Sequence, residues 1–229
     1  MVLNLMLSIL SSALLFLILK KFRDWNVETV HGILVNYFTA SLLSISFSNI
    51  SLVDSKAHIS VIWPYALGIG LLFIIVFVLT GYTAQLCGMA ASSIASKMSM
   101  VIPISLGVIL YNESFGIQKA IGIALAIPAV IMVGGKPNST SPQKIDNSYW
   151  YLPILLFLGA GMVDTAIKFA QHHLMQDGNM YLVMSMIFGS AGIFGLLNLI
   201  RETFSMKRGL TIRSILGGML LGTVNFFSL

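Results

Sequence analysis

The chain has 229 residues, of which 57% are hydrophobic and only 9% are charged, and its mean hydropathy is +0.91. An average soluble domain carries about 25% charged residues, so this composition excludes a soluble globular protein and predicts an all-α integral membrane protein. The net charge of +5 comes from basic residues scattered over short connecting segments. That distribution indicates a role in membrane orientation rather than nucleic-acid binding.

Long uncharged segments follow one another along the chain. A helix needs about 20 apolar residues to cross the hydrocarbon core of a bilayer. The predicted helices cover residues 2–19, 31–49, 61–86, 90–111, 115–134, 150–173, 179–200 and 212 onward. The basic residues near the N-terminus follow the first segment, whereas a cleavable signal peptide carries them in front. The first segment is therefore predicted to be a membrane span.

A polar connector, residues 136–149, separates five predicted spans (1–135) from three (150–229). LGIGLLFIIVF (67–77) aligns with LGGMLLGTVNF (216–226) at an offset of 149 residues. This similarity predicts two five-helix repeats, inverted because five crossings reverse the direction of the second copy. The second repeat is incomplete at Leu229, so about 55 further residues are expected to complete it. A fragment ending there is expected to transport nothing.

Residues 91–133 carry a characteristic order of small residues, proline, glutamate and glycine. In chain order these are Ala91, Ser92, Ser93, Ala95, Pro103, Glu113 and Gly122. The stretch resembles the end of the repeat unit in the drug/metabolite transporter superfamily, specifically its EamA-like members. The resemblance implies ten helices in two repeats, located in the inner or plasma membrane. It also implies a carrier of small solutes (amino acids, metabolites, toxic compounds or sugar conjugates) that needs no organic cofactor.

The chain departs from this family pattern in its first two helices. Many members carry a Trp-Gly pair in the first helix and an arginine in the second. Here the first helix lacks that pair, and the second has Asn36-Tyr37 instead. The substrate subclass therefore does not transfer.

Orientation is predicted differently by charge and by resemblance. Loops after odd-numbered spans hold nine basic residues, against two (Lys56 and Lys119) in the other loops, which places the N-terminus outside. The resemblance implies an N-terminus in the cytoplasm, and we favour the charge rule because it comes from this chain. The nine are Lys20, Lys21, Arg23, Lys136, Lys144, Arg201, Lys207, Arg208 and Arg213.

Asp164 and Lys168 lie near the middle of the sixth span, in GMVDTAIKFAQ. Residues four apart share a helix face, so the two side chains can pair. They either form an ion pair that makes insertion tolerable, or line a central site, as intramembrane ionisable residues commonly do. In the second case Asp164 binds a cationic group of the solute or exchanges a proton. Gly161 and Ala160 on the same face are expected to permit close helix approach.

The fourth span offers a second charged candidate. Lys97 costs about 2.5 to 3.5 kcal/mol in a membrane unless it snorkels or pairs. It either snorkels or faces a cavity together with Ser93 and Ser96. Pro103 removes a backbone donor, which predicts a kink beside a cavity, although proline is also common in membrane helices. For Glu113 at the end of this span, a capping role is favoured over transport.

Two polar residues in other spans complete the predicted substrate-binding set. Gln85 ends the third span and Asn225 lies in the eighth, where each could bind solute or join neighbouring helices. His172-His173 is a weak metal signal, because adjacent residues on a helix point in different directions. No metal site is therefore predicted. The single cysteine, Cys87, excludes an internal disulfide.

The predicted function is secondary transport of a small metabolite, amino acid or drug-like solute by alternating access, with proton coupling as an option. Catalytic motifs such as a nucleophile elbow, a phosphate loop or a zinc-binding His-Glu motif are missing from the sequence, so no enzyme is predicted. The alternatives are a non-transporting scaffold or assembly subunit and, less favoured, a membrane-embedded enzyme. The expected partners are the solute, the lipid bilayer, protons and a second copy of the chain, but no nucleic acid.

Overall fold

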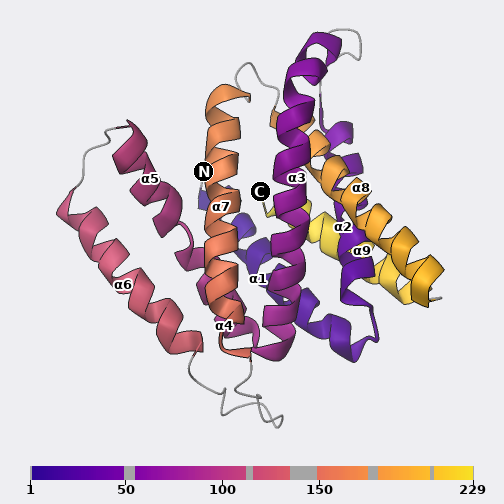
Figure 1. The fold of residues 1–229 in the computed structure, drawn as a ribbon, viewed down its shortest axis with the longest axis horizontal. Helices are drawn as coiled ribbons and strands as arrows, with labels where there is room; N and C mark the ends of the chain where they lie inside the picture. The colour runs from indigo at the N-terminus through magenta and orange to yellow at the C-terminus, as the bar shows by residue number, and fades with distance from the viewer. Residues whose placement is uncertain are drawn as a thin grey trace.

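The computed structural model describes residues 2–48, 55–111, 116–134, 149–174, 180–206 and 209–228, and every regular element in them is a helix. Figure 1 shows the bundle that these helices form. In chain order they are α1 (Val2–Asp24), α2 (Thr29–Ser46), α3 (Ser55–Leu86), α4 (Met89–Met98), α5 (Val101–Tyr111), α6 (Ile117–Gly134), α7 (Leu152–His173), α8 (Met180–Met206) and α9 (Ile212–Phe227). The all-helical prediction is confirmed.

Most helix boundaries lie within a few residues of the predicted ones. The clearest differences are that α3 begins earlier, at Ser55, and that α8 continues beyond residue 200 to Met206. Most of the additional residues at these ends are polar or charged. Apolar composition therefore predicts where the apolar segment ends, but the helix continues beyond it. The predicted helices were therefore correct in position, and too short at the start of α3 and at the ends of α8 and α1, which continues to Asp24.

One predicted span is wrong as a single helix. Residues 90–111 form two helices, α4 and α5, separated by a turn at Ser99 and Met100. Pro103 has no amide hydrogen to donate to the Ser99 carbonyl four residues earlier. The Ile102 amide donates to that carbonyl instead, at 2.9 Å, which is the tighter spacing of a 3₁₀ turn. The helix axis is thus interrupted one turn before the proline.

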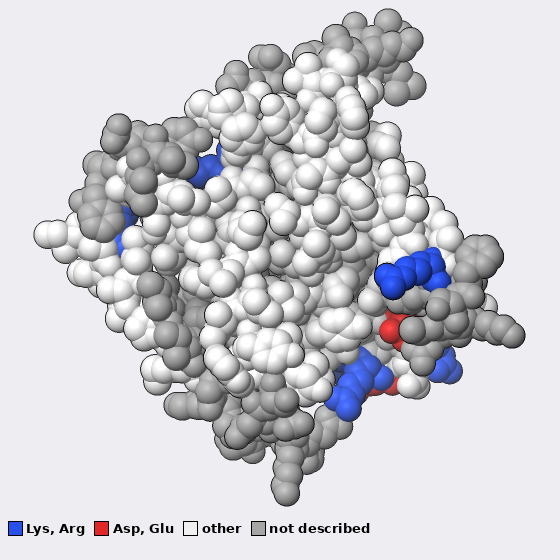
Figure 2. Space-filling model, viewed as in Figure 1, with Lys and Arg blue, Asp and Glu red and all other residues white. Residues whose placement is uncertain are grey.

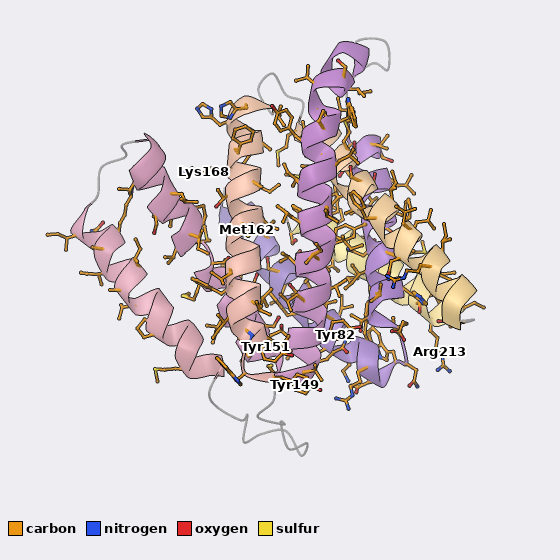
Figure 3. The ribbon with its side chains drawn as sticks, in the orientation of Figure 1. Tyr82, Tyr149, Tyr151, Met162, Lys168 and Arg213 are labelled. Atoms are coloured by element: carbon orange, nitrogen blue, oxygen red, sulfur yellow. The ribbon has the colours of Figure 1, made fainter. Side chains whose placement is uncertain are left out.

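The chain is a membrane-embedded protein. Within the described ranges four segments are long and apolar enough to cross a bilayer: Ile59–Leu86, Met89–Val108, Leu152–His173 and Met180–Arg201. Figure 2 shows a face whose centre is without charged side chains, with acidic and most basic groups near its lower right edge and a few basic groups at its upper left. Arg213, at the start of α9, lies at that edge in Figure 3. The uncharged area is suited to lipid contact.

The tightest packing joins α2 to α9. A Cβ atom at Gly218 would lie 2.5 Å from the Gly32 carbonyl oxygen, and one at Gly222 would lie 2.6 Å from the Asn36 carbonyl oxygen. Because these neighbours are backbone atoms, they cannot rotate aside. The two helices therefore approach closely only because glycine occupies both positions on α9, as small residues permit in membrane bundles.

Tyr37 on α2 is the centre of the aromatic core. Its side chain is fully buried, and its hydroxyl donates a hydrogen bond to the Phe73 carbonyl at 2.8 Å. The rings of Phe73, Phe77 and Phe188 surround it at centroid distances of 6.4, 5.6 and 6.0 Å. This core joins α2, α3 and α8, and it fixes Phe73 and Phe77 on the α3 face that borders the candidate site.

Candidate functional site

A central cavity of about 270 Å³ lies between α1, α3, α4, α7 and α9. Its apolar lining includes Phe16, Phe73 and Phe77. Its polar lining comes from all five helices and the turn after α9: Ser12, Thr80, Ser96, Lys97, Asp164, Asn225 and Ser228. An aromatic wall facing a carboxyl group, an ammonium group and an amide can bind a small polar solute.

A second cavity of about 500 Å³ lies beside the first, between α4, α5 and α7. It is lined by Ser96, Lys97, Met100, Pro103, Ile104, Asp164, Ile167, Lys168 and Gln171. Four residues line both cavities: Ser96, Lys97, Asp164 and Ile167. Asp164 and Lys97 therefore lie at the boundary between the two spaces.

Asp164 lies a little past the middle of α7, which has 22 residues. Figure 3 labels Met162 near the middle of this helix and Lys168 closer to its upper end. Asp164 Oδ2 is 2.8 Å from Ser99 Oγ, in the turn between α4 and α5. Ser99 is fully buried, and its Oγ is also 2.5 Å from the Ser96 carbonyl oxygen. Asp164 is thus connected directly to the turn between α4 and α5.

A glycine brings the two elements into contact. Gly161 lies three residues before Asp164, and a Cβ there would overlap the side chain of Ile102, including Ile102 Cβ at 2.8 Å. Ala160 is buried and packs in a small cluster with Ala95 and Leu156. The prediction that Gly161 and Ala160 permit close helix approach is confirmed. Without that approach, Ser99 would not reach Asp164.

The two predicted lysines take different positions. Lys97 lies in the last turn of α4 and lines both cavities, whereas Lys168 lines the larger cavity alone. Both side chains are exposed. The structure gives the Asp164 carboxyl group a hydrogen bond with Ser99, on another element. The pairing of Asp164 with Lys168 stays a prediction.

The remaining predicted residues separate into two groups. Asn225 lines the central cavity, is 6% exposed, and its Nδ2 has no hydrogen-bond partner among the described residues. Gln85 instead donates from Nε2 to the Leu19 carbonyl at 3.1 Å and to Thr29 Oγ1 at 2.8 Å. It therefore joins α3 to α1 and α2. Neither Gln85 nor Ser93 is among the residues that line the two cavities.

The histidine pair lies at the end of α7. His173 Nδ1 is 3.1 Å from the Phe169 carbonyl oxygen, and both histidine side chains are exposed. Among the described residues no group of three or more His, Cys, Asp or Glu side chains could hold a metal ion. Glu113 and the polar connector up to residue 148 lie outside the described residues.

Sequence reasoning missed Ser99 and the contribution of α1. Ser99 could have been found, because it lies four residues before Pro103 and therefore has the carbonyl that the proline leaves without its helical partner. Ser12, Leu15 and Phe16 reach the cavity from α1. Their residue types are ordinary in a membrane helix, so no local signal distinguishes them.

No family model and no solved structure matches the chain. The chain is similar to an uncharacterized protein of Haemophilus influenzae, with 28% identity over 235 aligned residues. The alignment covers 99% of this chain and 76% of that protein. The similarity therefore extends over nearly the whole chain, and that protein's description assigns it no activity.

Proposed function

We propose that the chain is a secondary transporter that carries a small solute across the membrane by alternating access, and that it is an EamA-like member of the drug/metabolite transporter superfamily. The observation that carries the proposal is the central cavity, which is lined by helices from both sides of the polar connector and holds Asp164 and Lys97. A scaffold has no need for a polar cavity inside an apolar bundle. Intramembrane ionisable residues commonly mark substrate or ion paths.

Helix pairing supports two inverted repeats. In that arrangement α1, α2 and α3 correspond to α7, α8 and α9. Two-fold symmetry requires contacts between helices to occur in equivalent pairs. If α1 contacts α9, then α7 must contact α3, and if α2 contacts α9, then α8 must contact α3. All four contacts are present, and α2 also packs against α8, its own counterpart. Such repeats bind substrate between them near the midplane.

The residues that line the cavity follow the same correspondence. Val76 and Asn225 are 149 residues apart, and so are Leu15 and Asp164. All four line the central cavity. Equivalent positions of two repeats meet at a common space when the symmetry axis passes through it. In both pairs the first repeat contributes an apolar side chain and the second a polar one, so the proposed site is chemically asymmetric.

The binding chemistry follows from this asymmetry. Asp164 would receive a cationic or amino group of the solute, while Lys97 and the Asn225 amide would receive an anionic or carbonyl group. Ser96 adds a hydroxyl group, and the phenylalanine wall accepts an apolar portion. A cavity of about 270 Å³ lies just below the usual range for ligand pockets of about 300 to 1,000 Å³, so it suits a small metabolite rather than a larger molecule.

The test is solute flux into liposomes that contain the full-length protein, measured over a panel of amino acids and other small metabolites. The expected result is saturable uptake of at least one solute and loss of that uptake in Asp164→Asn, with membrane insertion unchanged. Asp24→Asn is the matched control, because Asp24 is an exposed carboxylate at the end of α1 that pairs with Lys21 at 3.3 Å.

Three outcomes would count against the proposal. Wild-type flux in Asp164→Asn at matched protein amount would remove Asp164 from the site. No flux of any solute in the panel would favour the non-transporting scaffold. Chemical conversion of a solute without net movement would favour a membrane-embedded enzyme.

A further inference from the structure

We propose that Asp164 holds a proton in the conformation described here, and that Ser99 transmits loss of this proton to the interruption between α4 and α5. This proton site would couple proton movement to solute transport. That coupling role rests on the proposed transport function. The site consists of three oxygen-bearing groups in a row: the Asp164 carboxyl group, the Ser99 hydroxyl group and the Ser96 backbone carbonyl group.

Hydrogen counting carries the proposal. The Ser99 hydroxyl group has one hydrogen, yet its oxygen lies 2.5 Å from the Ser96 carbonyl oxygen and 2.8 Å from Asp164 Oδ2. A backbone carbonyl oxygen can only accept a hydrogen bond, and so can an ionised carboxylate. With the single hydroxyl hydrogen given to Ser96, the nearer oxygen, the contact with Asp164 lacks a hydrogen unless the carboxyl group supplies it.

Burial makes this deficit costly. Ser99 Oγ is fully buried and cannot turn to water, so a contact of this oxygen with Asp164 Oδ2 that lacks a hydrogen is unfavourable. A protonated Asp164 removes the conflict, because its hydroxyl group donates to Ser99 Oγ while Ser99 donates to the Ser96 carbonyl. Both contacts then have a hydrogen, and the row runs in one direction from α7 to the last turn of α4.

The charged neighbours oppose protonation and make the site switchable. Residues from α1, α3, α4, α5, α7 and α9 line the two cavities, and the titratable ones besides Asp164 are Lys97 on α4 and Lys168 on α7. Lys119, on α6, lines neither cavity. Both cavity lysines are exposed, and an ammonium group approaching the carboxyl group would favour its ionised form. The row of hydrogen bonds therefore favours the protonated form of Asp164, whereas the lysines favour the ionised form.

Loss of the proton from Asp164 changes the hydrogen bond between Ser99 and the Ser96 carbonyl group, at the turn between α4 and α5. The proton passes to water in the larger cavity, and the carboxylate oxygen next to Ser99 then accepts the hydroxyl hydrogen of Ser99. That hydrogen leaves the Ser96 carbonyl, which belongs to the last turn of α4. No bond other than hydrogen bonds is made or broken, and the helix end loses its side-chain donor. Protonation of Asp164 is thus linked to the geometry between α4 and α5.

The test is infrared spectroscopy of the purified full-length protein in lipid nanodiscs during a pH titration, with no solute present. We expect a carbonyl band of a protonated carboxyl group that is absent from Asp164→Asn. In Ser99→Ala the protonated form loses both hydrogen bonds of the row, whereas the ionised form loses one, so the midpoint of the titration moves to lower pH. The expected shift is about one pH unit, because one unit corresponds to about 1.4 kcal/mol, roughly one hydrogen bond.

Conservative variants keep the test interpretable. Ser99→Thr keeps the hydroxyl group and is expected to keep the wild-type midpoint, while Ser99→Cys, a weak acceptor, shifts it in the same direction as alanine by less. Ser105→Ala is the matched control, because that α5 hydroxyl donates to the Val101 carbonyl at 2.8 Å. It is expected to leave the midpoint unchanged.

Two results would overturn the proton site. If Ser99→Ala moved the midpoint to higher pH or left it unchanged, Ser99 would not stabilise the protonated form, and the proposed row of hydrogen bonds would be wrong. If no band distinguishes the wild type from Asp164→Asn at any pH, Asp164 holds no proton. The infrared titration involves no solute, so it tests the proton site separately from transport. If the titration shows the proton site but the liposomes show no flux, only the proposed transport function is contradicted.

Discussion

Two polar side chains, Asp164 on α7 and Asn36 on α2, lie among apolar helices in very different surroundings. Asp164 borders two cavities and is 2.8 Å from a hydroxyl group of another helix. Asn36 is fully buried beside Gly222, and neither its Oδ1 nor its Nδ2 has a hydrogen-bond partner among the described residues. The first side chain has a polar neighbour and space for a ligand, whereas the second has neither.

The comparison teaches that polarity within a membrane helix is not by itself a sign of function. In the sequence, both residues are polar side chains within largely apolar segments. The surroundings separate them, because a solute can reach only the residue that borders a cavity. Asn36 therefore belongs to the packing between α2 and α9, and Asp164 to the proposed site. The following predictions test this division, beginning with the largest expected effect on stability.

Gly222→Val is expected to reduce the free energy of unfolding by about 3 kcal/mol, the upper part of the range for overpacking. The added Cβ would meet the Asn36 carbonyl oxygen at 2.6 Å, and the backbone cannot rotate aside. Unfolding in mixed detergent micelles measures the effect. Gly68→Val is the matched control, because a Cβ at Gly68 has no atom within 4 Å. Equal stability of the two variants would contradict the close packing of α2 and α9.

Gln85→Leu is expected to reduce the free energy of unfolding by about 2 kcal/mol, because the Leu19 carbonyl and Thr29 hydroxyl groups lose a buried partner. Solute flux per folded molecule should not change, since Gln85 joins helices and lines neither cavity. The same unfolding titration and the liposome assay measure the two quantities. Lost flux with unchanged stability would return Gln85 to the substrate-binding set.

Asn36→Leu is expected to increase the free energy of unfolding by about 1 kcal/mol. The change replaces an amide without hydrogen-bond partners by an apolar side chain of similar size, which removes the cost of burying unsatisfied polar atoms. The increase would appear as a higher detergent fraction at the unfolding midpoint. A loss of stability would show that the amide has a partner, and would weaken the contrast with Asp164.

Asp164→Asn is expected to change the free energy of unfolding by less than about 0.5 kcal/mol while it removes flux. The asparagine amide can still donate to Ser99 Oγ, so it reproduces the hydrogen bonding of a protonated carboxyl group and lacks only the exchangeable proton. Parallel unfolding and flux measurements on one preparation test this. A large loss of stability would place Asp164 in the same class as Gln85.

Local composition determined the helices of this protein. The bilayer requires about 20 apolar residues for each crossing, so the uncharged segments could be located without any knowledge of their neighbours. The same rule marked Asp164 and Lys97 as exceptional, because an ionisable residue inside such a segment costs free energy unless it has a function or a partner. The positions of α1, α2, α6, α7 and α9, and the choice of Asp164, followed from the sequence.

The tertiary structure alone decided which of these residues meet. Whether Gln85 binds a solute or joins helices depends on Leu19 and Thr29, which are far from it in the chain. Asp164 makes a hydrogen bond with a serine 65 residues away, which no pattern on its own helix indicates. Helix periodicity fixes the face on which a residue lies, but the close approach permitted by Gly161 fixes what that face touches.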